Sequence, residues 1–354
     1  MSREALLAAL GPAFDPEPPP SELAICHTPY GQLGGDDVEG TLTERLERFG
    51  RVGVVGPVGC GKTSLARYVA ETSPSLAPIY LNVAAEDHDK VSSPRGFLEL
   101  LVSHLADAAT EATGGGARQQ DRLLRGGQPT VDLAGEERGR TLKLGASWLA
   151  SGSVASDLVK TLPSREAYRT IAQMAGPANE ALDAIRAHDL VPVLVADDTD
   201  RLLRLPGEDG VALFEAFFGE VLRSLVDQLY DFALVVAIHD DYRERYGYAE
   251  LVSGRIEHHL EVPELTHAAQ LGMILDTRAS FLLRDDGDPQ AGAHTRADLF
   301  TPAALEALFA LHVHEQARSL RRTLATARSA IGLALDEPAE RVDARHVRAA
   351  ASDT

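Results

Sequence analysis

Short, almost uninterrupted apolar runs recur along the first three quarters of the chain. They cover residues 51–55, 78–83, 191–196, 232–238 and 259–262. Helical spacing of apolar residues predicts helices in most of the intervening stretches, over 42–49, 63–71, 94–109, 164–188 with an interruption at Gly176-Pro177, and 211–229. Strands that are apolar on both sides and alternate with helices indicate a parallel sheet covered on both faces, so we predict an α/β fold.

Beyond residue 266 the pattern contains only helical periods, over 266–284, 302–313, 315–333 and 343–351. Ala317, Leu320, Leu324, Ala327 and Ile331 form one apolar stripe at spacings of three and four. We therefore predict three parts: an arm over 1–40, an α/β domain over 41–262, and a small all-helical domain over 263–354. The proline-rich stretch 15–20 makes the arm either an extended segment that packs on the rest of the chain or a linker.

Residues 111–163 interrupt the alternation of strands and helices. Glycines punctuate this stretch at 114–116 and 126–127, and polar residues dominate it. We interpret it as an insertion, with a hairpin near 130–144 and otherwise loop, and long loops of this kind are often functional.

Composition narrows the class of protein. Of the 354 residues, 44% are hydrophobic and 25% charged, as in ordinary globular proteins. The net charge of −19 disfavours extensive nucleic-acid binding, although a local basic patch stays possible. Two cysteines form no disulfide framework, and neither a signal peptide nor a membrane-length apolar stretch is present. We expect a cytoplasmic protein without a membrane partner.

One segment carries specific chemistry. The sequence Gly-Pro-Val-Gly-Cys-Gly-Lys-Thr at 56–63 fits G-x-x-x-x-G-K-[ST], and it lies between a predicted strand and a predicted helix. Backbone N–H groups of such a loop surround phosphates, Lys62 reaches the β- and γ-phosphates, and the Thr63 hydroxyl binds Mg²⁺. The alternative is a glycine-rich turn before an ordinary helix. We assign nucleotide contacts to Gly56, Pro57, Val58, Gly59, Cys60, Gly61, Lys62, Thr63 and Ser64.

Acidic residues follow the third predicted strand at Asp197 and Asp198. The carboxyl ends of parallel strands face the ligand, so Asp197 is predicted to hold Mg²⁺ together with Thr63, and Asp198 to orient the attacking water. A capping role for these acids is the alternative. After the fourth strand, His239 is predicted to contact the γ-phosphate or that water, and the alternative there is an N-cap by Asp240 or Asp241.

Taken together, these segments resemble the AAA+ ATPases, and within them the origin-recognition-like initiators. The resemblance covers about residues 40–351 and rests on the loop at 56–63, Ser-Leu-Ala-Arg-Tyr-Val at 64–69, Ile-Tyr-Leu-Asn at 79–82, the acidic strand at 193–198, and three later segments at 253–256, 315–321 and 342–347. It implies an αβα sandwich with sheet order 5-1-4-3-2, followed by a helical lid.

The resemblance also implies roles for two arginines. Arg318 would reach from a lid helix to the γ-phosphate of its own subunit, and Arg255 would act as an arginine finger in a neighbouring subunit. Each could instead be an ordinary surface arginine.

Three features depart from the family. The strand ends in Asp197-Asp198 where the family commonly has Asp-Glu, so hydrolysis could be slow. The Asp-Asp-x-Asp-Arg pattern at 197–201 also resembles the STAND and KAP NTPases, which act as switches. The insertion lengthens the path between the loop and the acids and offers a site for a partner. We expect no winged-helix DNA-binding domain after the lid.

We therefore expect an ATPase with ATP and Mg²⁺ as cofactors, which couples nucleotide state to homo-oligomerisation and to remodelling or signalling through a partner protein. A bacterial conflict or mobile-element system is the setting that this architecture suggests. The alternatives are a slowly hydrolysing nucleotide switch and a DNA-associated loader that relies on a separate DNA-binding partner.

Overall fold

The computed structural model describes residues 14–15, 19–114, 117–128, 130–132, 166–199, 202, 208–244, 247–284, 299–337 and 339–352. Its central sheet contains five parallel strands: β1 (Arg51–Val55), β2 (Leu76–Asn82), β5 (Val191–Asp197), β6 (Ala233–Ile238) and β7 (His258–Glu261). Their order is β2-β5-β6-β1-β7, which confirms the predicted order.

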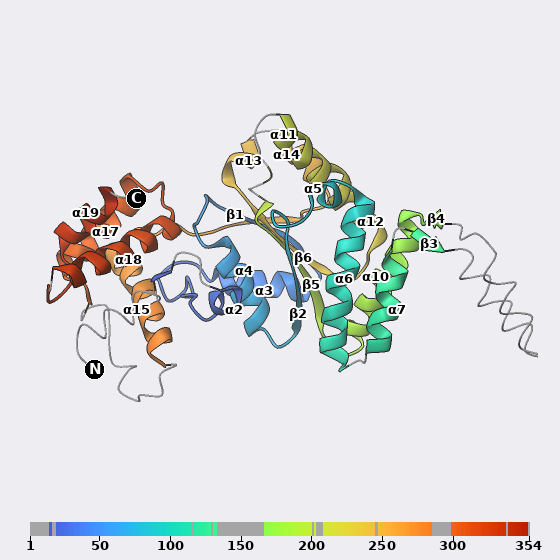
Figure 1. Cartoon of the computed structure of the whole chain (residues 1–354), viewed down its shortest axis with the longest axis horizontal. Helices are drawn as coiled ribbons and strands as arrows, with labels where there is room; N and C mark the ends of the chain where they lie inside the picture. The colour runs from blue at the N-terminus through green and yellow to red at the C-terminus, as the bar shows by residue number, and fades with distance from the viewer. Residues whose placement is uncertain are drawn as a thin grey trace, which may run out of the picture.

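Helices cover both faces of this sheet (Figure 1). In β5, Val193 and Val195 belong to a core shared with α3 (Val38–Glu47) and α4 (Lys62–Thr72), whereas Leu194 and Ala196 belong to the opposite core. That second core contains the larger helices, which are α6 (Pro94–Thr113), α10 (Ile171–Arg186), and the continuous run of α11 (Glu208–Glu215), η3 (Ala216–Val221) and α12 (Leu222–Gln228). Alternate residues of one strand thus serve two hydrophobic layers, as an αβα sandwich requires.

A separate helical unit lies to one side of the sandwich (Figure 1). It contains α15 (Ala268–Arg284), α17 (Pro302–His314), α18 (Leu320–Asp336) and α19 (Ala344–Ser352), and its core includes Leu271, Leu308, Leu324 and Ile331. Phe14 of the arm is fully buried in the same core, edge-on to Phe300 at a centroid distance of 5.9 Å. We call this unit the lid. Among the described helices of the whole chain, none is long and apolar enough to cross a membrane.

The arm packs on the rest of the chain from residue 19 onward. It contains a short helix, α2 (Pro20–Leu23), followed by turns, and it buries Ala24, Cys26, Tyr30 and Leu33. This part packs on α4 and α15, as one of the two expectations had it, but as turns and not as an extended segment. Residues 16–18 of the proline-rich stretch lie outside the described part. Three other short helices are α5 (His88–Val91), α13 (Asp240–Glu244) and α14 (Tyr248–Val252).

The predicted helix over 164–188 starts later than expected and is not interrupted. Residues Glu166–Tyr168 form strand β4, and α10 begins after Thr170, whose side chain and that of Gln173 form a reciprocal capping box. Pro177 lies inside α10, where the missing N–H costs one hydrogen bond. Burial of Met174, Ala178 and Leu182 stabilises the helix on both sides of the proline.

The insertion is more helical than predicted. Its first glycine, Gly114, ends α6 because it takes a left-handed conformation at the C-cap, and α7 (Ala117–Gly127) is the next described helix. Strand β3 (Thr130–Asp132) begins where the hairpin was expected, but it pairs with β4 (Glu166–Tyr168) in an antiparallel ladder. Residues 133–165, including the rest of the expected hairpin, lie outside the described part.

The helix predicted over 315–333 begins five residues later, at Leu320. Ala317 and Arg318 take positive φ angles of 48° and 58°, which a helix cannot contain. The Ser319 hydroxyl then accepts a hydrogen bond from the Arg322 N–H and caps α18. Arg318 therefore lies in the turn before the helix.

Candidate functional site

The loop at 56–63, which we call the phosphate loop, joins β1 to α4. Gly59 and Gly61 have φ angles of +75° and +110°, so the loop uses two conformations that favour glycine. Gly61 is the N-cap of α4, and the first turn of that helix contains no acidic residue. Its N-terminal N–H groups and helix dipole therefore favour an anion.

Lys62 is buried at the base of the loop. Its Nζ donates hydrogen bonds of 2.9 Å each to the carbonyl oxygens of Gly56 and Pro57. These contacts hold a positive charge at the start of α4. A phosphate bound by the loop would compete with both carbonyls for the ammonium group.

The acidic strand end meets α4 directly. The Thr63 hydroxyl donates a 2.9 Å hydrogen bond to Oδ1 of Asp197, the last residue of β5. Burial, and then the charge of Asp198, raise the pKa of Asp197 above its ordinary value. A hydroxyl and a carboxylate in contact at one sheet edge provide the hard oxygen ligands that Mg²⁺ prefers, and a cation there would favour the ionised carboxylate.

Asp198 lies just past the strand in a left-handed conformation, with φ of 57°. Asn82, at the end of the neighbouring strand β2, donates a 3.1 Å hydrogen bond from Nδ2 to Asp198 Oδ2. Both Asp197 and Asp198 line the same cavity as the phosphate loop. Asn82 entered the sequence analysis only as part of a strand, and its contact with this carboxylate was not foreseen.

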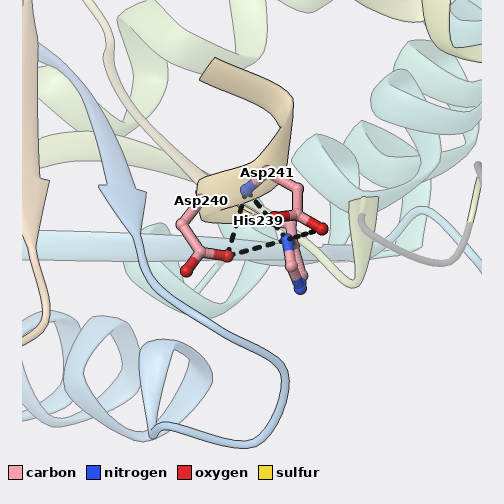
Figure 2. Close-up of side chains that lie close together, drawn as sticks. All are labelled: His239, Asp240 and Asp241. Atoms are coloured by element: carbon pink, nitrogen blue, oxygen red, sulfur yellow. Dashed lines mark hydrogen bonds and ion pairs between the residues drawn. The ribbon is translucent and has the colours of Figure 1, made fainter. Parts of the chain in front are cut away.

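His239 follows β6, and Figure 2 shows it beside two carboxylates. Its Nδ1 lies 2.8 Å from Asp240 Oδ1, and the Asp241 N–H lies within hydrogen-bond distance of both Asp240 Oδ1 and His239 Nδ1. Because one nitrogen cannot donate to the carboxylate and accept from the amide at once, Nδ1–H bound to Asp240 is the consistent arrangement. The other ring nitrogen points away from both carboxylates in Figure 2. Among the described residues that line the cavity, His239 is absent.

The cavity extends from the phosphate loop to the arm and the lid. The arm supplies Leu23, Cys26, His27, Thr28, Tyr30 and Leu33, and α15 supplies Ile274 and Arg278. Thr28 donates a 2.9 Å hydrogen bond to the Thr277 hydroxyl of α15, and Arg278 donates to the Asp15 carbonyl at 3.0 Å. A nucleotide with its phosphates at the loop would place its nucleoside between these two elements. None of these side chains was predicted, because the arm carries no recognisable motif.

Two lid arginines border the cavity. Arg318 forms an ion pair with Glu264, and the two side chains are 45% and 54% exposed. Arg321 lies one turn along, where its N–H donates a 3.2 Å hydrogen bond to the carbonyl of Gly59 at the apex of the phosphate loop. The sequence analysis assigned the lid role to Arg318 alone, whereas the structure brings the backbone of Arg321 against the loop.

Arg255 lies elsewhere. It follows α14, its guanidinium donates to the Leu251 carbonyl, and it is absent from the described residues around the cavity. Burial lowers its pKa below the ordinary arginine value. Within one subunit, therefore, Arg255 does not contribute to the site, and its predicted role in a neighbouring subunit stays a prediction.

Comparison with known proteins leaves the family open. No known protein family matches the chain, and no curated protein is similar to it in sequence. Among solved structures, the chain is similar to the ORC1 protein of Aeropyrum pernix in complex with DNA, with 18% identity, a TM-score of 0.47, and coverage of 92% of this chain and 66% of that one. It is also similar to the ORC2 protein of that organism in ADPNP–ADP complexes, with 14% identity, a TM-score of 0.47, and coverage of 89% and 67%. The chain thus spans about two thirds of the length of these proteins.

Proposed function

We propose that the chain is an ATPase of the AAA+ type, which binds ATP with Mg²⁺ between the phosphate loop and the lid and hydrolyses it. The contact between Thr63 and Asp197, at 2.9 Å, carries this proposal. It joins the two motifs that the reaction needs, from positions 134 residues apart in the sequence, inside a cavity that the lid also borders.

The roles of the loop and strand residues follow from their positions. Lys62 would exchange its carbonyl contacts for the β- and γ-phosphate oxygens, and the loop N–H groups would surround the same charge. Thr63 and Asp197 would hold the Mg²⁺, which when bound neutralises charge on the phosphates. Asp198, oriented by Asn82, would accept a hydrogen bond from the attacking water and align it with the γ-phosphate.

The lid would sense the γ-phosphate through an arginine. Arg321 is the better candidate in this arrangement, because its backbone already contacts Gly59, while Arg318 is engaged by Glu264. Both arginines belong to the proposal, and single alanine substitutions distinguish them. Substitution of the arginine that acts on the transferring phosphoryl group should lower kcat, whereas substitution of the other arginine should leave kcat near the wild-type value.

The proposal extends to assembly. We propose that Arg255 completes the site of an adjacent copy, so that nucleotide state controls oligomerisation and, through it, a partner protein. The setting of a bacterial conflict or mobile-element system is part of the proposal and rests on the architecture alone.

A nucleotide switch with little hydrolysis is a second candidate, and one observation favours it. Asp198 stands where the family has a glutamate, and its carboxylate is held by Asn82. A side chain shorter by one methylene and fixed in place leaves a water less well aligned, and misalignment on the ångström scale costs large factors in rate.

Steady-state ATP turnover at increasing protein concentration, with Lys62→Ala as the blank, tests both candidates. Turnover that exceeds the blank and depends on Mg²⁺ supports the ATPase. Tight Mg²⁺-dependent ATP binding without turnover above the blank identifies the switch. Absence of nucleotide binding in the wild-type protein contradicts both.

A further inference from the structure

A chain of buried polar contacts connects the arm to the start of α4. Nε2 of His27 lies 2.8 Å from Oε1 of Glu39 in α3, and Nδ1 lies 3.2 Å from the hydroxyl of Ser64. The hydroxyl of Ser64 in turn donates to the Leu23 carbonyl at 3.1 Å. His27 and Glu39 are 8% and 7% exposed, so this pair is shielded from water, whereas Ser64 is half-buried. His27 and Ser64 both line the cavity.

Glu39 is ionised in this arrangement. Burial alone would raise its pKa, but the hydrogen bonds from His27 and from the Tyr30 N–H, which donates to Oε1 at 2.9 Å, outweigh burial and hold the pKa below the ordinary value. An ionised carboxylate only accepts hydrogen bonds, so Nε2 of His27 must carry a proton.

The proton on the other ring nitrogen follows from Ser64. A carbonyl oxygen can only accept, so the Ser64 hydrogen is committed to Leu23, and the Ser64 oxygen must accept from Nδ1. These contacts are satisfied together when Nε2 donates to Glu39 and Nδ1 donates to Ser64. The ring of Tyr68 packs beside the imidazole with a centroid distance of 4.7 Å and helps to fix its position.

We infer that His27, held by Glu39, is a positioning residue for nucleotide binding, and that it acts by fixing the Ser64 hydroxyl as a donor to the phosphate nearest the nucleoside. This inference rests on the proposed nucleotide site. Ser64 lies in the first turn of α4, on the side of the phosphate loop that faces Leu23 and the arm. A nucleoside between the arm and α15 must connect to the loop past this hydroxyl.

The mechanism needs only one rotation. While the Ser64 oxygen accepts from His27, its hydrogen can turn from the Leu23 carbonyl to a phosphate oxygen. Without His27 the hydroxyl loses the donor that fixes its direction and can rotate freely. The arm thereby contributes to phosphate binding as well as to the nucleoside side of the cavity.

A double-mutant cycle on His27 and Ser64, read out by equilibrium binding of a fluorescent ATP analogue with Mg²⁺, tests this inference. His27→Gln, Glu39→Gln and Ser64→Ala should each weaken binding about tenfold, as expected for a hydrogen bond to a charged group. Because His27 acts through Ser64, the His27→Gln/Ser64→Ala double variant should bind no more weakly than Ser64→Ala.

Two controls separate the possible failures. His104→Gln makes the same substitution in another His–Glu pair, His104 Nε2 with Glu86 Oε1 at 3.8 Å on the far side of the sheet, and should bind like the wild type. Thermal unfolding of each variant verifies that it folds. The inference is overturned if the double variant loses affinity by the product of the two single losses. It is also overturned if His27→Gln binds the nucleotide analogue as tightly as the wild type. If Lys62→Ala binds as well as the wild type, the proposed nucleotide site itself is wrong.

Discussion

At the scale of single residues, the two adjacent acids have separable environments. Asp197 is half-buried and contacts Thr63, whereas the Asp198 carboxylate accepts a hydrogen bond from Asn82. One position suits a metal ligand and the other a residue that faces a water. Substitutions at the two positions should therefore affect different properties, namely metal binding at Asp197 and turnover at Asp198.

We predict that Asp198→Asn keeps Mg²⁺-dependent ATP affinity and loses turnover by about 10²- to 10⁴-fold, the range for removal of a general base. Asp197→Asn should lose the Mg²⁺ dependence of binding as well. Titration of ATP affinity against Mg²⁺, together with kcat, distinguishes them. Asp189→Asn is a matched control, because Asp189 has nearly the same φ, 60°, outside the cavity. The assignment is wrong if Asp198→Asn abolishes binding too.

A second residue-scale prediction concerns pH. His312 is buried in the lid, where it contacts the Thr323 hydroxyl at 2.9 Å. Burial, and then the Arg318 cation, lower the pKa of His312 below the ordinary 6.5. The unfolded chain thus binds a proton that the native protein does not. The contribution of neutral His312 to the free energy of unfolding is therefore fully present above pH 6.5. It is lost as the pH falls through 6.5 toward the lower pKa of His312 in the native protein.

Denaturant unfolding at a series of pH values checks this. His312→Gln should reduce the loss of unfolding free energy on acidification, by up to about 1.4 kcal/mol per pH unit for a single group. Exposed His314→Gln, two residues away, should retain the wild-type slope. An identical slope for all three proteins would show that His312 does not cause the effect.

At the scale of elements, the phosphate loop and the lid helix α18 are in direct contact. A Cβ atom at Gly59 would come within 2.5 Å of the Ser319 hydroxyl and 2.9 Å of the Arg321 Cβ. The absence of a side chain at this position thus lets the lid approach. A larger residue would either displace α18 or distort the loop.

We predict that Gly59→Ala destabilises the protein by about 1–2 kcal/mol through its left-handed backbone, and by more where the lid cannot move away. Gly254→Ala carries the same backbone penalty, since φ is +70°, but a Cβ there meets nothing within 4 Å. The difference in unfolding free energy between the two variants measures the lid contact. Equal losses would mean that the lid accommodates the methyl group at no cost.

The elements also show how far sequence reasoning extends. All five sheet strands were predicted. Four of them are short apolar runs, whereas β7 has one apolar residue, Leu260, and its predicted bounds were shifted by one residue. The phosphate loop was predicted because phosphate binding requires particular residues at fixed spacings within eight positions. The start of α18 was missed because Ala317 fits the helical spacing of the apolar residues in α18, although it lies before the helix. The helix begins at Leu320, after the N-cap Ser319. The arm residues around the cavity were missed because they depend on tertiary contacts with α4 and α15, and no local pattern encodes those contacts.

At the scale of the whole molecule, the predicted site residue Arg255 lies away from the cavity. Arg255 cannot act on its own subunit in this arrangement, so its proposed role requires a second copy. An interface between copies would make activity depend on protein concentration.

We predict that specific ATPase activity rises with concentration, and that Arg255→Ala lowers turnover by about 10³-fold at saturating protein without changing ATP affinity. Mixing supplies a decisive control. Lys62→Ala subunits lack their own nucleotide contact but retain Arg255, so adding them to Arg255→Ala subunits should restore activity. Equal loss of binding and turnover in Arg255→Ala, or no complementation on mixing, contradicts a role in the neighbouring subunit.

The placement of charge around the cavity has a kinetic consequence. The chain carries a net charge of −19, yet Lys62, Arg278, Arg318 and Arg321 border the place where phosphates would bind. An approaching nucleotide is repelled by the whole surface at long range and attracted only near the cavity. Salt screens interactions beyond a Debye length of about 10 Å at 0.1 M, and buried contacts much less. Moderate salt should therefore raise the association rate constant of the nucleotide. The dissociation rate constant should respond less to ionic strength.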